Sequence, residues 1–117
     1  MKLVVTGSRN GCPQVDYWLT RFVNEVCRPD LVILGCARGV DTQAKLWAQR
    51  LGLPYIVYRA GWETHGKAAG PIRNREMVNA ASRGDYCVAF LEQGSRGTLD
   101  CLTYAQKRHL ICYVFNI

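Results

Sequence analysis

The chain has 117 residues, a formal net charge of +6 and a hydrophobic fraction of 49%, which is ordinary for a globular protein. This length predicts one domain over residues 1–117 and excludes several independent cores. No apolar run is long enough to cross a membrane and no signal-peptide pattern opens the chain, so we expect a cytoplasmic protein without a membrane partner. The six cysteines form no C-x-x-C pair, and neither histidine lies at ligand spacing from one, so we expect no metal site.

Short apolar segments alternate with segments of helical periodicity along the chain. The expected strands are residues 3–6, 31–34, 55–58, 86–91 and 110–115, and the expected helices are residues 13–26, 41–51, 72–81 and 98–108. This alternation predicts an α/β fold, a compact Rossmann-like domain whose five-stranded parallel sheet has the order 3-2-1-4-5 and helices on both faces. Ligands of such folds bind at the carboxyl edge of the sheet, where strand order reverses, here between the first and fourth strands.

Two glycine turns are expected to face each other across that reversal point, one after the first strand and one after the fourth. Gly7-Ser8-Arg9 provides backbone N–H groups, a hydroxyl and a guanidinium, which together suit a phosphate. The other turn is Gly94-Ser95-Arg96-Gly97-Thr98, whose glycines allow close approach of a ligand and whose Thr98 is expected to cap the next helix. Neither turn has the dinucleotide or Walker fingerprint, and a plain helix-capping loop is the alternative for both.

The turn from Gly35 to Asp41 follows the second strand. Arg38 is expected to reach the pocket, whereas Asp41 either contacts a ligand or, like Thr42, only caps the following helix. Many basic residues fall in glycine-containing turns or the helix starts after them: Arg9, Arg38, Arg59, Lys67, Arg73, Arg75 and Arg96. Such a cluster favours one compact anionic ligand over a long phosphate backbone.

Residues 62–77 combine a tryptophan, glycines and basic side chains. We expect a loop that passes at Gly70-Pro71 into a helix, with glycine at the cap and proline at the first helical position. The basic residues then lie at a helix N-terminus, whose free N–H groups attract anions. Trp62 either stacks on a base or packs on its own loop, and His65 is either an acid or base in catalysis or a solvent-facing side chain.

The four turns, and above all the run Gly-Lys-x-Ala-Gly-Pro-x-Arg-Asn-x-x-Met at residues 66–77, resemble the YspA, cpYpsA-related branch of the SLOG superfamily. The resemblance implies a domain that binds a nucleotide or nucleotide-derived ligand. Our leading hypothesis is a sensor or sequestering protein for an ADP-ribose-like, NAD-derived or cyclic nucleotide, and we expect no cofactor. The ligand-binding residues that it implies are Gly7, Ser8, Arg9, Gly35, Arg38, Gly39, Asp41, Trp62, Lys67, Gly70, Arg73, Asn74, Gly94, Gly97 and Thr98, to which the fourth turn adds Ser95 and Arg96. The chain departs from the family pattern at Cys36, where a second glycine is typical, and at Gly61, where an acidic residue is usual.

The same superfamily includes the LOG phosphoribohydrolases, whose motif Pro-Gly-Gly-x-Gly-Thr-x-x-Glu ends in a catalytic glutamate. Cys101 stands at that position, and a thiol does not replace a carboxylate, so we expect binding without catalysis. Asp100 is adjacent but is expected to point elsewhere, about 100° round the helix. A hydrolase remains the alternative, and its candidate catalytic residues are Glu63, His65, Arg73, Glu76 and Asp100.

Single-stranded nucleic-acid binding is a third hypothesis, raised by the resemblance to the DprA branch and the positive net charge. It requires an extended basic track with interleaved aromatic residues, whereas the sequence shows one pocket-sized cluster, so nucleic acid is the disfavoured partner. Whether a homodimer or a higher homo-oligomer completes the pocket stays open.

Overall fold

The computed structural model describes residues 1–117. Its strands are β1 (Lys2–Gly7), β2 (Leu31–Gly35), β3 (Tyr55–Tyr58), β4 (Tyr86–Leu91) and β5 (Ile111–Asn116). Its helices are α1 (Val15–Glu25), α2 (Val40–Leu51), α3 (Trp62–His65), α4 (Ala69–Asn79) and α5 (Arg96–Lys107), with one 3₁₀ turn, η1 (Gly66–Ala68). Strands and helices alternate as the sequence predicts, and the main difference lies between β3 and α4.

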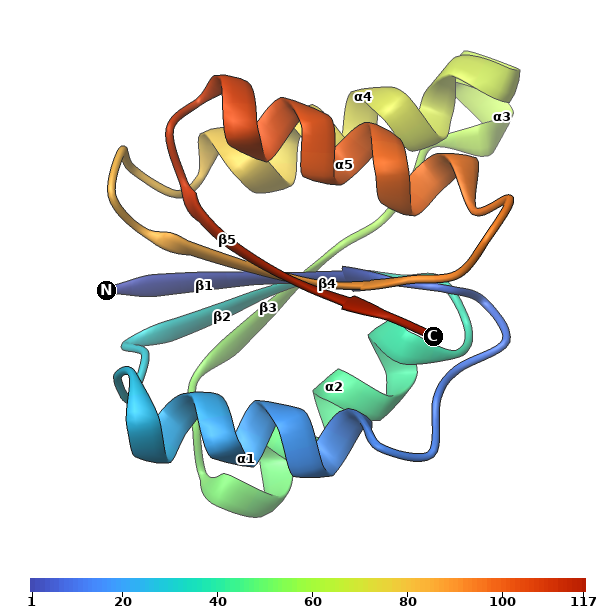
Figure 1. The fold of residues 1–117 in the computed structure, drawn as a ribbon. Helices are drawn as coiled ribbons and strands as arrows, with labels where there is room; N and C mark the ends of the chain where they lie inside the picture. Colours follow the sequence, from blue (N-terminus) through green and yellow to red (C-terminus); the bar gives the residue numbers. More distant parts are fainter.

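The five strands form one parallel sheet in the order β3-β2-β1-β4-β5, which confirms the predicted fold (Figure 1). β1 is the central strand, and its Val4 lies opposite Ile33 of β2 and Cys87 of β4. Because the strands are parallel, all their carboxyl ends lie at one edge. The turns that follow β1 and β4 are therefore neighbours at the point where strand order reverses.

Helices cover both faces of the sheet, α1 and α2 on one and α4 and α5 on the other (Figure 1). Leu3 and Val5 of β1 belong to the apolar cluster beneath α1 and α2, whereas Val4 belongs to the cluster beneath α4 and α5. The buried Trp47 of α2 donates its indole N–H to Thr20 Oγ1 of α1 at 3.2 Å, which joins the two helices. Burial on both faces explains why β1, β2 and β4 are continuous apolar runs, whereas the edge strand β5 is largely exposed. None of the helices combines the length and the apolar character needed to cross a membrane.

The segment after β3 is helical from Trp62 onward, so the expectation of a loop up to Gly70 is wrong. α3 and η1 lead directly into α4, which begins at Ala69 and places Gly70 and Pro71 inside its first turn. A proline is tolerated there because the first four N–H groups of a helix have no intrahelical acceptor. The helix N-terminus therefore lies slightly before the position that the Gly-Pro pair predicts.

The predicted caps of α2 and α5 are also wrong. α2 is preceded by Gly39, whose φ of 79° lies in the left-handed region that favours glycine. Asp41 and Thr42 instead turn back to Ala37, whose N–H donates to Asp41 Oδ2 at 3.1 Å and whose carbonyl accepts from Thr42 Oγ1 at 3.3 Å. α5 likewise starts before Thr98, which lies in its first turn. These shifts leave Asp41 and Thr98 at the carboxyl edge without a capping role.

Candidate functional site

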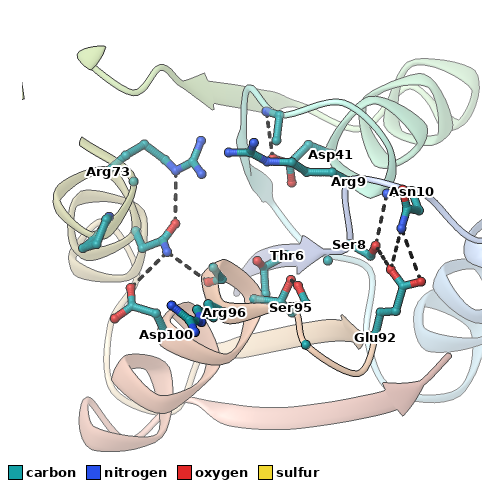
Figure 2. A pocket seen from close by; sticks show the side chains of 18 of the residues that line it. Thr6, Ser8, Arg9, Asn10, Asp41, Arg73, Glu92, Ser95, Arg96 and Asp100 are labelled. Carbon is teal, nitrogen blue, oxygen red and sulfur yellow. Dashed lines mark hydrogen bonds between the residues drawn. The ribbon is translucent and has the colours of Figure 1, made fainter. Parts of the chain in front are cut away.

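A cavity of about 670 Å³ opens at the carboxyl edge of the sheet, above the ends of β1 and β4 (Figure 2). Four segments that are distant in sequence form its wall: the end of β1, the β2–α2 turn, the helical segment after β3 and the β4–α5 turn. The lining residues are Thr6, Gly7, Ser8, Arg9, Asn10, Ala37, Asp41, Trp62, Lys67, Gly70, Pro71, Arg73, Asn74, Glu92, Gln93, Gly94, Ser95, Arg96, Gly97, Thr98 and Asp100.

The predicted ligand-binding residues all line this cavity except Gly35, Arg38 and Gly39. Gly35 lies beneath it: a Cβ there would come within 2.6 Å of Arg73 Nη1 and 2.7 Å of Asp41 Oδ2. A Cβ on Gly39 would overlap the backbone that follows β1. Both glycines thus allow the wall of the cavity to pack closely, although neither lines it.

Arg38 lines an adjoining hollow of about 580 Å³ together with Cys36. Arg9, Ala37, Trp62 and Arg73 line both spaces, so the hollow extends the cavity across the end of β2. Trp62 is 48% exposed and turns part of its ring toward both spaces. Its position is open enough for stacking on a planar ligand group.

Four cationic side chains line the cavity: Arg9, Lys67, Arg73 and Arg96. None of them forms an ion pair. The ion pairs of the molecule all lie outside the cavity. Figure 2 shows the guanidinium groups of Arg9 and Arg73 pointing toward one another across the cavity. Arg73 Nε donates to Asn74 Oδ1 at 3.1 Å, so a neutral amide orients this guanidinium and leaves its charge available to an anion.

Asp41 is the most deeply buried carboxylate of the site, with 6% of its surface exposed. Burial raises its pKa from 3.8 to about 6, while the charges of Arg73 and Arg9 and the hydrogen bond from the Ala37 N–H act in the opposite direction. Its charge therefore changes in mildly acidic solution, directly beside the two arginines.

Glu92 is a lining residue that the sequence interpretation missed. Ser8 Oγ donates a hydrogen bond to its Oε1, and Asn10 Nδ2 donates to the same oxygen at 2.9 Å. These two hydrogen bonds lower the pKa of Glu92, so it is ionised at neutral pH. The available signal was its position directly after β4, beside the turn that follows β1.

Asn74 and Asp100 connect α4 with α5 at the other wall. The amide of Asn74, only 4% exposed, donates to Asp100 Oδ2 at 3.1 Å and to the carbonyl oxygen of Gly97 at 3.2 Å (Figure 2). Asp100 lines the cavity, so the expectation that it points elsewhere is wrong. Cys101 is the residue that faces the core, where burial raises the pKa of its thiol to about 12.

The other candidate catalytic residues lie outside the cavity. Glu63, His65 and Glu76 are exposed on α3 and α4 and do not line it. Of the five candidates, the structure brings only Arg73 and Asp100 to the cavity. No group of three or more His, Cys, Asp or Glu side chains is arranged to bind a metal ion.

Comparison with solved structures identifies the fold. The X-ray structure of DNA processing protein A (DprA) from Streptococcus pneumoniae has a TM-score of 0.76 at 17% sequence identity and covers 97% of this chain. The match covers 49% of the DprA chain, so the present chain spans about half its length. The likeness shows that the two chains share a Rossmann-like α/β fold, the fold that the alternation of strands and helices in the sequence predicts.

Sequence comparison identifies a relative. No protein-family model matches the chain. The Gene 61 protein of Mycobacterium phage D29 is 37% identical over 114 residues, and the match covers 91% of this chain and 89% of that protein. With this identity over nearly the whole length of both, the chain belongs to the family of the phage Gene 61 protein.

Proposed function

We propose that residues 1–117 act as one domain that binds a nucleotide or nucleotide-derived anion, of the ADP-ribose, NAD-derived or cyclic nucleotide type, as a cytoplasmic sensor or sequestering protein. The observation that carries this proposal is the set of four cationic side chains, Arg9, Lys67, Arg73 and Arg96, that line one cavity and form no ion pair. Within the SLOG superfamily, the run at residues 66–77 favours the YspA branch.

The shape of the site supports a small ligand. A volume of about 670 Å³ lies within the range of small-molecule and cofactor pockets, roughly 300–1,000 Å³. The first turn of α5 supplies free N–H groups beside Gly97, where no neighbouring atom lies within 4 Å of a Cβ position and a phosphate has access. Trp62 offers an exposed ring for a base.

Calorimetric titration tests the proposal. Wild-type protein is titrated with ADP-ribose, NAD, cyclic AMP and the four ribonucleoside 5′-diphosphates, and we expect micromolar or tighter binding of at least one. Arg73→Ala removes a charge-assisted contact and is expected to weaken that binding by at least about tenfold. Arg50→Ala is the matched control because Arg50 is exposed on α2 and outside the cavity. Equal affinity in wild type and Arg73→Ala contradicts the proposed site.

A hydrolase is the second candidate, and the position of Asp100 favours it. Its carboxylate lines the cavity with Arg73, in the turn of α5 that precedes Cys101, so a carboxylate and an arginine are both present. Carboxylates direct water or stabilise a cationic centre in glycoside hydrolysis. Product analysis after incubation with the same panel separates the two candidates, because only a hydrolase releases free base or ribose phosphate.

Binding of single-stranded nucleic acid is a third candidate, favoured by the shared fold with a DNA processing protein. The cationic residues line a cavity with Trp62 at its rim, and a strand that follows a groove would need further basic residues beyond it. An oligonucleotide that binds with an affinity falling steeply with salt, while all the small ligands fail, would establish this function instead.

A further inference from the structure

Glu92 places a negative charge in a cavity whose other exposed charges are mostly positive. It follows β4 directly, and its carboxylate is held by Ser8 and Asn10 from the neighbouring turn. A carboxylate in an anion-binding cavity repels a phosphate, so it needs a different ligand group to face it. The cavity therefore has two regions. One suits an anionic part of the ligand, and the other suits a part that donates hydrogen bonds.

The carboxylate has acceptor capacity left for a ligand. Both short hydrogen bonds from Ser8 and Asn10 go to Oε1, and Oε2 accepts only a long contact of 3.4 Å from Asn10 Nδ2. An ionised carboxylate has about four acceptor positions. The unused positions accept a hydrogen bond from a donor group of the ligand, such as a hydroxyl or an amine.

The arrangement of charges orders the ligand. Figure 2 shows Arg73 and Glu92 at opposite sides of the cavity, with Arg9 between them reaching toward Arg73. A phosphate bound between the arginines leaves the adjoining, neutral part of a nucleotide to approach Glu92. A further hollow of about 500 Å³ adjoins Glu92, and its lining mixes the hydrophobic Leu91, Leu99 and Ile117 with six other residues: Glu92, Gln93, Gly94, Ser95, Arg96 and Asn116.

We propose that Glu92 selects ligands with free ribose hydroxyls, by accepting hydrogen bonds from the 2′ and 3′ hydroxyl groups at Oε2. The proposal rests on the nucleotide-binding function proposed above and assigns one residue of that site to one chemical group. In dinucleotide-binding folds an acidic residue accepts from ribose hydroxyls in the same manner, although it follows a different strand. The competing role for Glu92 is a clamp that only joins the turns after β1 and β4.

The test compares ligands with and without the hydroxyls. Wild type, Glu92→Gln and Glu92→Ala are titrated calorimetrically with ADP, GDP, CDP and UDP and with their 2′,3′-dideoxy counterparts. In Glu92→Gln the amide oxygen still accepts from Ser8 and Asn10, so the turns stay joined. Glu76→Gln, an exposed carboxylate on α4 outside the cavity, is the matched control.

We expect wild type to prefer the ribonucleotide over its dideoxy form by at least about tenfold, the effect of hydrogen bonds to a charged acceptor. The preference falls to less than about threefold in Glu92→Gln and disappears in Glu92→Ala. Dideoxy nucleotides should bind both variants as tightly as they bind wild type, or more tightly. Both substitutions remove the negative charge of Glu92 from a site that binds an anion. Glu76→Gln keeps the wild-type preference.

Two results overturn the proposal and leave the proposed function intact. One is wild-type binding without preference for the hydroxyls, and the other is an equal loss of both ligand forms in the Glu92 variants, as a clamp requires. If none of the eight nucleotides binds wild type, the assignment of Glu92 and nucleotide diphosphate binding both fail. The two proposals are thus distinguished by whether wild type binds at all.

Discussion

The basic residues at the carboxyl edge differ from those on the α1–α2 layer in what they contact. On that layer Arg21 pairs with Glu25 of the next helical turn at 2.9 Å, and Arg50 of α2 pairs with Asp16 of α1. In the cavity, Arg9 and Arg73 lie close to Asp41, which has carboxylate oxygens available, yet no ion pair forms. The chain is therefore able to pair its arginines, and does so only outside the cavity.

The carboxylates of the cavity explain this difference. Each one is hydrogen-bonded by a neutral donor: Asp41 by the Ala37 N–H, Glu92 by Ser8 and Asn10, and Asp100 by Asn74. Neutral donors stabilise a carboxylate without consuming a cationic side chain. The cavity thus holds its carboxylates by neutral donors and leaves its cationic groups without ion pairs, a condition that suits a ligand with both an anionic part and a donor part.

The largest expected effect concerns Asp41, the buried carboxylate of this comparison. Its folded-state pKa of about 6 exceeds the ordinary 3.8, so the folded state binds the proton more tightly than the unfolded state. The resulting stabilisation is fully present below pH 3.8 and is lost as the pH rises through about 6. Wild type should lose about 3 kcal/mol of unfolding free energy relative to Asp41→Asn across that range. Urea unfolding at acidic and neutral pH measures the difference.

Asp16→Asn is the control for Asp41, because Asp16 is an exposed carboxylate in an ion pair on the α1–α2 layer. Removal of the Asp16 carboxylate should not abolish the loss of unfolding free energy that wild type shows between acidic and neutral pH. Parallel stability curves for wild type and Asp41→Asn would show that burial does not raise the pKa of Asp41. In that case the charge of Asp41 would neutralise part of the arginine pair at all working pH values.

The fold was predictable because strand periodicity and glycine turns are local signals. The predicted strand order places Ser8 and Gly94 at the same edge of the sheet, as the structure does. Glu92 was missed because its role depends on Ser8, which is 84 residues away, and an acidic residue after a strand resembles an ordinary loop residue. The direction expected for Asp100 is wrong because the rotation of α5 depends on how its apolar face packs, and the buried Cys101 fixes that rotation.

A second prediction concerns Gly97, which lies in the first turn of α5 and lines the cavity. A Cβ there would meet no atom within 4 Å, and alanine in a helix is more favourable than glycine by roughly 0.5–1 kcal/mol. Gly97→Ala should therefore stabilise the free protein by that amount. Nucleotide affinity should fall severalfold, because the added methyl group projects where a phosphate reaches the backbone. Urea unfolding and calorimetry measure the two opposite effects, and unchanged affinity would place the phosphate elsewhere.

The smallest expected effect lies on the α1–α2 layer, in the exposed pair of Arg50 and Asp16. Arg50→Ala should lower the free energy of unfolding by less than about 1 kcal/mol, because an exposed ion pair gains little in water and is screened by salt. A double-mutant cycle with Asp16→Ala, measured by urea unfolding, isolates the coupling between the two side chains. A coupling energy of several kcal/mol between Arg50 and Asp16 would mean that the unpaired arginines of the cavity forgo considerable stabilisation. A small coupling energy means that leaving Arg9 and Arg73 free for a ligand costs the fold little.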